Sequence, residues 1–179
     1  MAFTPINEKN PLAADILKAC AFLYPDNIPL RLFEAQSERI FSPAFAKLPH
    51  RSLEAINLLC SSSLVRHTAA TTAKRSNSDV YREKLSIHHL VQTIVGLEID
   101  NAERLEWCER LISGLRGEVD SNFEQLDNEY FTRVMEVYGP HIQQVVLQFQ
   151  KWEAGLSDIS NDLPFVDRPL SHTTGSQMV

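Results

Sequence analysis

Two adjacent histidines stand at a junction in the sequence where an imidazole could do chemistry. His88 and His89 lie in the stretch KLSIHHLVQTIV, between a short apolar run and the first turn of an amphipathic helical pattern. An imidazole placed there could ligate a metal, transfer a proton, or donate a hydrogen bond to a phosphate bound at the helix start. It could also cap the helix or pack against its neighbours. The residues elsewhere in the chain decide between these roles.

Neither a metal site nor an enzyme active site is predicted. The remaining histidines are scattered: His50, His67, His141 and His172. The cysteines are dispersed through apolar helical patterns: Cys20, Cys60 and Cys108. This spacing fits reduced core thiols rather than a zinc or disulfide framework. Glu103, Glu106 and Glu109 recur at helical spacing, as on a solvated helix face. No nucleophile, base and orienting group are spaced for catalysis, so we expect no enzyme.

A phosphate-binding loop is also missing from the sequence. The P-loop pattern G-x-x-x-x-G-K-[ST] needs a glycine followed by a lysine. None of the six glycines of the chain is followed by lysine. We therefore predict no cofactor for the isolated chain.

Charge is unevenly distributed along the 179 residues. Residues 1–96 carry 11 Lys and Arg against 8 Asp and Glu, whereas residues 97–179 carry 6 against 15. The net charge of −6 argues against general nucleic-acid binding. The N-terminus has no apolar signal region, and no run of about 18 apolar residues occurs. We expect a cytoplasmic protein without a membrane partner.

The elements that must position His88 are predicted to be mainly helical. Asn10 can cap a first helix and Pro11 can open it, because proline's missing N–H is no loss there. Pro29 can start a second, short helix through Phe33. A third helix is predicted from about Ser52. The apolar residues of this third helix that share a face are Leu53, Ile56, Leu59 and Cys60.

After the third helix the apolar period changes to that of strands. Residues 63–67 and 84–87 form two strand-like runs joined by a polar stretch, which predicts a two-stranded ribbon with a long tip. A helix from about His88 to Glu98 follows. Its predicted inward face is apolar: Leu90, Val91, Ile94 and Val95. His89 falls on the opposite side, so we expect it to face solvent.

The second half of the chain is predicted to be helical until its last residues. Helices are expected over 101–115, 122–137 and 140–154, the last opened by Pro140. From Leu156 onward, serines, prolines and other polar residues predict a disordered tail.

Several segments in this order carry a resemblance to a known family. PLAADILKACAFLYPDNIPLRLF, SLEAINLLCSSSLVRH, LSIHHLVQTIV and ERLEWCERLISGL resemble the winged-helix region of STAND/NB-ARC signalling ATPases, particularly those ending in tetratricopeptide repeats. The match covers roughly residues 9 to 115, and GPHIQQVVLQFQKW resembles the lead-in to the repeats. The resemblance implies a winged-helix domain of three helices and a two-stranded ribbon over 1–98, and a helical, repeat-like extension over 99–155. The tail would then be 156–179.

The resemblance also implies a role for the two histidines. In that family a Met-His-Asp triplet lies at the strand-to-helix junction, and its His contacts the β-phosphate of bound ADP. Here Ile87 takes the Met position, His88 the His position and His89 the Asp position, so the usual acidic partner is replaced. ADP or ATP would be held by a separate or missing nucleotide-binding domain, since the chain lacks the ATPase core.

We therefore expect a non-catalytic regulatory and interaction module of a STAND-type signalling NTPase. Its partners would be proteins, namely an NB-ARC region and helical repeats. The alternative is a winged-helix DNA-binding transcriptional regulator, since that fold often places its third helix in the major groove beside a basic wing. Here the third helix offers only Glu54 and Asn57 to read a base. The wing residues that could meet phosphates are Arg66, Lys74, Arg75, Arg82 and Lys84. We expect no nucleic-acid partner.

Overall fold

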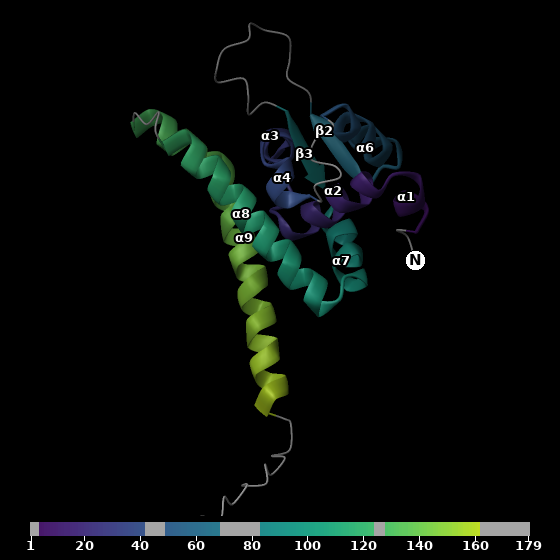
Figure 1. Cartoon of the computed structure of the whole chain (residues 1–179), viewed down its shortest axis with the longest axis vertical. Coiled ribbons are helices and arrows are strands. Elements are labelled where there is room, and N and C mark those ends of the chain that lie inside the picture. Colours follow the sequence, from purple (N-terminus) through teal and green to yellow (C-terminus); the bar gives the residue numbers. More distant parts are fainter. Residues whose placement is uncertain (1–3, 42–48, 69–82, 124–127, 162–179) are drawn as a thin grey trace, which may run out of the picture.

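The computed structural model describes residues 4–41, 49–68, 83–123 and 128–161, and shows a mainly helical protein with a small antiparallel sheet (Figure 1). In chain order its elements are α1 Thr4–Lys9, α2 Pro11–Phe22, β1 Ile28–Pro29, α3 Leu30–Ala35, α4 Ser37–Ile40, α6 Pro49–Ser61, β2 Val65–Thr68, β3 Lys84–Ile87, α7 His89–Glu98, α8 Asn101–Phe123 and α9 Asn128–Asn161. No helix among these residues is long and apolar enough to cross a membrane.

Helix α2 lies at the centre of the core and begins where the sequence predicts. The Asn10 side chain accepts a hydrogen bond from the Ala13 N–H at 3.2 Å, and Pro11 occupies the first turn. The helix is buried on nearly all sides, because α6, α7 and α8 surround it. Cys20 and Cys108 are buried and Cys60 is half-buried, and all three thiols are free, as predicted.

Helix α6 begins earlier than predicted, at Pro49 instead of near Ser52. Most of its predicted inward face is confirmed, since Ile56 and Leu59 are buried and Cys60 is half-buried. Leu53 is the exception: it is 55% exposed, and Ala55 is buried beside Ile56.

The sheet has three strands in the order β1-β3-β2. The two strands of the predicted ribbon are present, with Val65 paired to Ile87 and Arg66 to Ser86. Strand β1 was not predicted, because two residues are too few to show an alternating pattern. It pairs Ile28 with Leu85 and places the turn before it next to the start of α7. The predicted tip of the ribbon falls largely at 69–82, outside the described residues.

Helix α7 starts after His88, as predicted within one residue, but only half of its predicted inward face is buried. Val95 is buried and Val91 packs against the core, as predicted, whereas Leu90 is 57% and Ile94 48% exposed. The rotation follows from a polar anchor. The Gln92 amide donates to the carbonyls of Cys20 and Leu23, both at 2.9 Å, at the C-terminal end of α2. Those carbonyls have no partner within their own helix, so Gln92 satisfies them and turns α7 toward α2.

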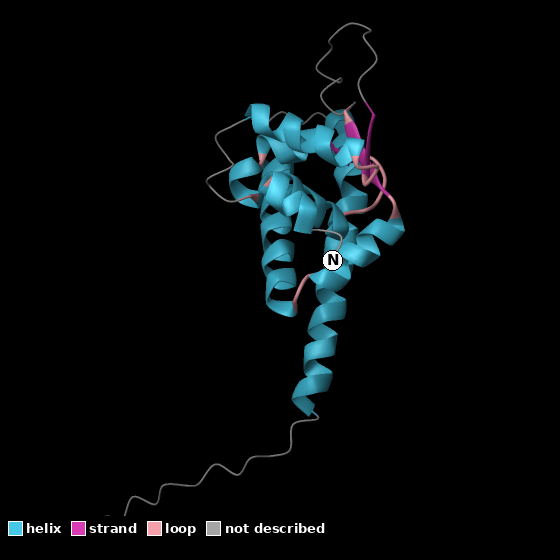
Figure 2. Cartoon of the chain, turned by 90° about the vertical axis from the view of Figure 1, so that its right-hand side faces the viewer, coloured by secondary structure: helices cyan, strands magenta, loops and turns pink. Residues whose placement is uncertain are grey.

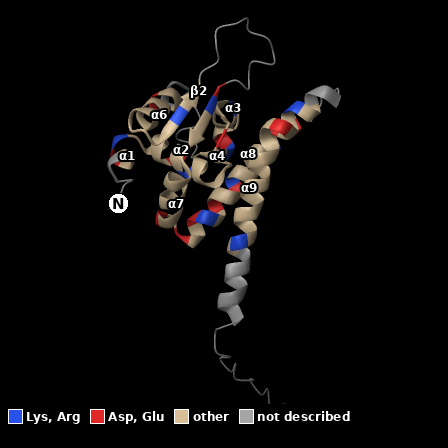
Figure 3. Cartoon of the chain, turned by 180° about the vertical axis from the view of Figure 1, so that it is seen from behind, with Lys and Arg blue, Asp and Glu red and all other residues tan. Residues whose placement is uncertain are grey.

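Helix α8 carries acidic and basic residues interspersed along its length (Figure 3). Glu106 and Glu109 are exposed, as the predicted solvated face requires. Glu103 is more enclosed: its carboxylate lies 2.5 Å from the Lys18 ammonium of α2 and accepts from the Trp107 indole N–H at 3.3 Å. Trp107 itself is buried. This end of α8 is therefore fixed to α2.

Helix α9 is a single helix, so our prediction of two helices, over 122–137 and 140–154, is wrong. Proline inside a helix loses one backbone hydrogen bond and crowds the carbonyl of the preceding turn. Burial on both sides of Pro140 offsets this cost, since Tyr138 and Val145 are fully buried. Gly139 has no Cβ, which removes part of the clash that disfavours helical backbone before proline.

The C-terminal part of α9 projects beyond the other helices (Figure 2). The helix continues to Asn161, past residue 156, where we predicted the tail to begin. Residues 162–179 lie outside the described part of the chain.

One continuous core joins α8 and α9 to the N-terminal elements. Leu111, Leu115 and Val145 belong to the same cluster of buried residues as Ile16 of α2 and Phe33 of α3. The domain boundary that we predicted after residue 98 crosses this shared core, and it stays a prediction from the sequence.

Candidate functional site: a groove beside His88

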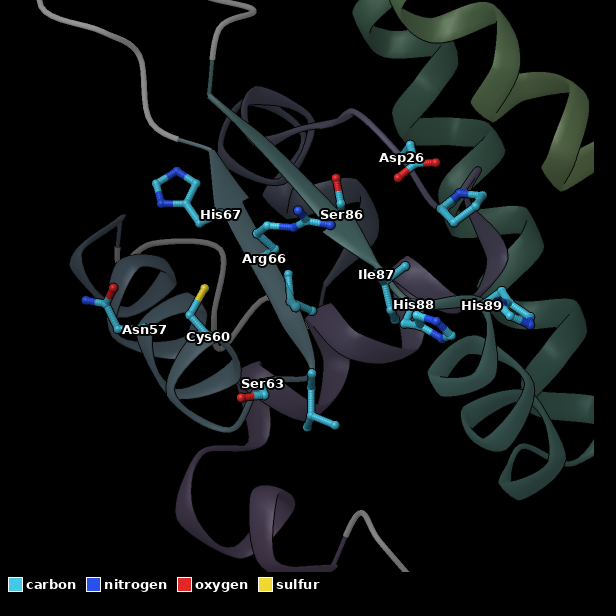
Figure 4. Close-up of a pocket in the computed structure, with 13 residues that line it drawn as sticks. Asp26, Asn57, Cys60, Ser63, Arg66, His67, Ser86, Ile87, His88 and His89 are labelled. Atoms are coloured by element: carbon cyan, nitrogen blue, oxygen red, sulfur yellow. The ribbon is translucent and has the colours of Figure 1, made fainter.

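The described part of the chain contains an open groove of about 770 Å³ at the junction of β3 and α7 (Figure 4). One wall is the C-terminal end of α6, and the floor is the β2–β3 ribbon. The opposite wall consists of His88, His89 and the turn before β1. Arg66 lies between these two walls. The groove brings together residues that are far apart in the sequence.

The α6 wall is shaped by the way that helix ends. Ser63 has a φ of 56°, the left-handed conformation common just after a helix. The Leu64 N–H then bonds back to the Leu59 carbonyl at 3.1 Å, which satisfies a carbonyl of the last turn. This reversal leads directly into β2. It leaves Asn57, Cys60 and Ser63 along the groove.

The floor of the groove carries a cation. Arg66 and Ser86 are directly opposed across β2 and β3, so their side chains lie on the same face of the sheet. Arg66 is exposed and forms no ion pair with a residue that the structure describes. His67 is half-buried, with Nε2 3.5 Å from a carboxylate oxygen of Glu83. An exposed, unpaired guanidinium is a ready partner for an anionic group.

His88 is the N-cap of α7, and this fixes its proton. Its Nδ1 accepts a hydrogen bond from the Leu90 N–H at 3.2 Å, so Nδ1 carries no hydrogen. The neutral ring then has its N–H at Nε2, which remains able to donate. The side chain is exposed and lines the groove. One imidazole therefore caps the helix and offers a hydrogen-bond donor to a ligand.

The residues on either side of His88 have different roles. Ile87 is buried, and its N–H donates to the Pro25 carbonyl at 2.9 Å, which ties β3 to the turn before β1. His89 is exposed, as predicted, and its ring centre lies 4.6 Å from that of His88. All three predicted site residues line the groove: His88 offers a ring nitrogen, His89 lies at its edge, and Ile87 holds the backbone in place.

The groove can bind an anion more readily than it can do covalent chemistry. Its side-chain donors include the guanidinium of Arg66, Nε2 of His88, the amide of Asn57, and the hydroxyls of Ser63 and Ser86. Asp26 is the one carboxylate among its lining residues. Among the described residues no group of three or more His, Cys, Asp or Glu could hold a metal. Ser63, Ser86 and the α6 residues were not part of our sequence-based site, because only the folded ribbon brings them to His88.

The exposed face of α6 has no basic side chain within the part that the structure describes. Its exposed residues include Leu53, Glu54 and Asn57. A helix that reads DNA in the major groove uses Arg, Lys, Asn or Gln on such a face, supported by phosphate contacts.

Comparison with known proteins places part of the chain in a family. Residues 5–104 match the family model described as "Domain of unknown function (DUF7779)". The match covers more than half of the chain and includes every residue of the groove. No curated protein and no solved structure matches the chain.

Proposed function

For this chain, which belongs to the DUF7779 family of domains of unknown function, we propose a role as a non-catalytic regulatory module of a STAND-type signalling NTPase. The proposal rests on the resemblance of its sequence segments and on the groove at His88. Its groove would close on the phosphates of a nucleotide held by a separate nucleotide-binding domain. The geometry of His88 carries the proposal: with Nδ1 engaged in the helix cap, Nε2–H is a donor in the same groove as the Arg66 guanidinium.

The arrangement of elements supports a winged-helix assignment for the N-terminal part. Strand β1 stands between the first core helix, α2, and the short helices α3 and α4. Helix α6 then leads into the β2–β3 ribbon, and β3 lies between β1 and β2. In this proposal α8 and α9, which pack on each other, form the helical extension that would continue into repeats.

Electrostatics favours a phosphate over other ligands in the groove. The α7 N-terminus carries a partial positive charge, which adds to the charge of Arg66. With Nδ1 engaged in the cap, the Nε2–H of His88 can donate to a phosphate oxygen. The proposed partners are a nucleotide-binding NB-ARC region and helical repeats, and the proposed location is the cytoplasm. The chain itself supplies no P-loop, so it should not hydrolyse ATP alone.

Two substitutions at His88 test the proposal. They are measured in a complex of this chain with its nucleotide-binding partner, a P-loop NTPase region encoded in the same gene or in a neighbouring one. His88→Ala removes both the cap and the donor, whereas His88→Asn keeps a good capping side chain but is too short to present Nε2–H. A lost hydrogen bond to a charged group costs about 1.5–3 kcal/mol. The dissociation constant of ADP, measured by calorimetry, should therefore rise by roughly ten- to a hundredfold in both variants.

The matched control is His89→Ala, which removes the neighbouring exposed imidazole and should change ADP affinity much less. If His88→Asn binds ADP like the wild type while His88→Ala does not, His88 acts only as a helix cap. Unchanged ADP affinity in both variants would refute the phosphate contact altogether. Turnover of ATP by the purified chain alone would contradict the non-catalytic assignment.

A further inference from the structure

His141 of α9 is buried where that helix crosses the turn before β1. Its side chain is only 1% exposed. Nε2 lies 3.3 Å from the Asn27 carbonyl oxygen, and Nδ1 has no hydrogen-bond partner among the described residues. A carbonyl can only accept, so Nε2 carries a hydrogen, and Nδ1, which is buried without an acceptor, carries none. The buried ring is therefore neutral and is held by one hydrogen bond.

The surroundings of His141 disfavour a second proton. Burial lowers the pKa of His141 to about 4, the Asn27 carbonyl acts in the opposite direction, and the positive charge of Lys84 lowers the pKa further. Lys84 also lies within 3.5 Å of the Asn27 side-chain oxygen. The remaining titratable groups in this pocket of about 260 Å³ are Tyr24, Asp26 and Glu136, all exposed to water. Water screens the two carboxylates, so neither compensates a charge on the buried ring.

The turn that His141 contacts is a small, defined surface. Asn27 has a φ of 58°, a left-handed conformation that asparagine tolerates, and this aims its carbonyl at α9. The Tyr24 ring meets the imidazole edge-on, with ring centres 6.4 Å apart. A proton on Nδ1 would have no acceptor among the described residues.

We propose that His141 is an acid-sensitive latch, which holds α9 against the turn at residues 24–28 when neutral and releases it when protonated. The release exposes Nδ1 to water, which accepts its hydrogen. The latch depends on contacts between α9 and the turn alone and does not rest on the function proposed for the groove. Once released, the middle of α9 is a marginal helix, because Pro140 interrupts its hydrogen bonding.

The direction of the pH dependence follows from the two protonation equilibria. The released ring has the ordinary pKa of about 6.5 and the docked ring one of about 4. Below pH 6.5 the released state binds more protons than the docked state, so docking weakens as the pH falls toward 4. Between pH 7 and pH 5 these values favour release by about 20-fold.

Two measurements on the whole chain test the latch. The His141 imidazole resonance, identified by NMR from its absence in His141→Gln, should not shift between pH 7 and 5. Hydrogen exchange, corrected for intrinsic rates, should lose about 20-fold of its protection in α9 around 134–145 over the same interval. Protection in α2 should change much less.

His141→Gln keeps a donor for the Asn27 carbonyl but cannot be protonated, so its α9 protection should be the same at both pH values. His89→Gln, which removes an exposed imidazole, should behave like the wild type. An equal loss of protection in wild type and His141→Gln would overturn the proposal. So would a His141 resonance that titrates near pH 6.5 while α9 stays protected, a result that holds even if the glutamine variant fails to fold.

Discussion

At the scale of single residues, Glu118 is a charged side chain that is fully buried in the core. Its carboxylate is fully buried and accepts from Arg31 Nε at 3.0 Å, Gln36 Nε2 at 2.9 Å and the Tyr138 hydroxyl at 3.0 Å. These donors come from α3, from the residue between α3 and α4, and from α9. One α8 side chain therefore connects three parts of the chain, and its charge is compensated by the Arg31 guanidinium.

Glu118→Ala should destabilise the protein by about 3 kcal/mol, because it leaves three donors around an empty site, one of them charged. Tyr138→Phe removes only one of the hydrogen bonds and should cost about 1 kcal/mol. Unfolding in urea, followed by circular dichroism, measures both. A loss below 1 kcal/mol for Glu118→Ala would mean that water replaces the carboxylate and that the network adds little stability.

The sequence predicts residues whose partners are local and misses those whose partners are distant. Asn10 caps α2, as predicted, and His88 caps α7, which was one of the roles considered for it; their N–H partners lie only two or three residues away. Glu118 and His141 make contacts across more than 80 residues. In the sequence they look like ordinary polar positions of amphipathic helices, and only the tertiary packing gives them a role.

At the scale of elements, two glycines inside helices have opposite surroundings. Gly96 of α7 has open space where a Cβ would be. Gly114 of α8 faces α4, and a Cβ there would lie 2.7 Å from Ile40 Cγ1, in the core. Both glycines weaken their helices in isolation, but only Gly114 is required for two helices to touch.

Gly96→Ala should raise the stability by up to about 1 kcal/mol, since alanine favours the helix and nothing obstructs its methyl group. Gly114→Ala should lower it by about 1–3 kcal/mol, because Ile40 and α4 must move. Thermal unfolding of the two variants gives shifts of opposite sign. Two upward shifts would show that α8 moves away from α4 without loss of packing.

The errors in the predicted elements also arise from contacts between residues that are distant in the sequence. Periodicity indicates that α7 is amphipathic, yet Gln92 rather than an apolar residue sets which side faces α2. Pro140 is a sound signal for a helix start, but tertiary burial of Tyr138 and Val145 carries α9 through it. Helix and strand type was predicted well, whereas rotation and continuity depend on contacts with other elements.

At the scale of the whole molecule, the family match and the packed core end at different places. The match stops at residue 104, within the first turn of α8. The core continues through Trp107, Leu111 and Leu115 of that helix and through Tyr138 of α9. The segment that the family model matches, residues 5–104, is therefore shorter than the part of the chain that forms the packed core.

A fragment of residues 1–104 should be much less stable than a fragment of residues 1–161. The shorter fragment loses the cover over Ile40 from α8 and the ion pair of Arg31 with Glu118. It should bind a hydrophobic dye and unfold with a shallow denaturant transition. If both fragments unfold cooperatively at the same midpoint, α8 and α9 form an independent extension, and the boundary predicted after residue 98 is also a boundary of folding.

The turn at residues 24–28 borders both the groove and the pocket beneath α9. Asp26 lines both cavities. On the groove side, the Pro25 carbonyl accepts a hydrogen bond from the Ile87 N–H, and on the α9 side the Asn27 carbonyl contacts His141. A ligand that shifts this turn on entering the groove must also change the proton affinity of His141, and protons must change the ligand's affinity by the same factor. Binding would then take up or release protons near pH 6, and calorimetry in two buffers of different ionisation enthalpy would count them. Equal heats in the two buffers would mean that the turn stays rigid and that the two cavities act independently.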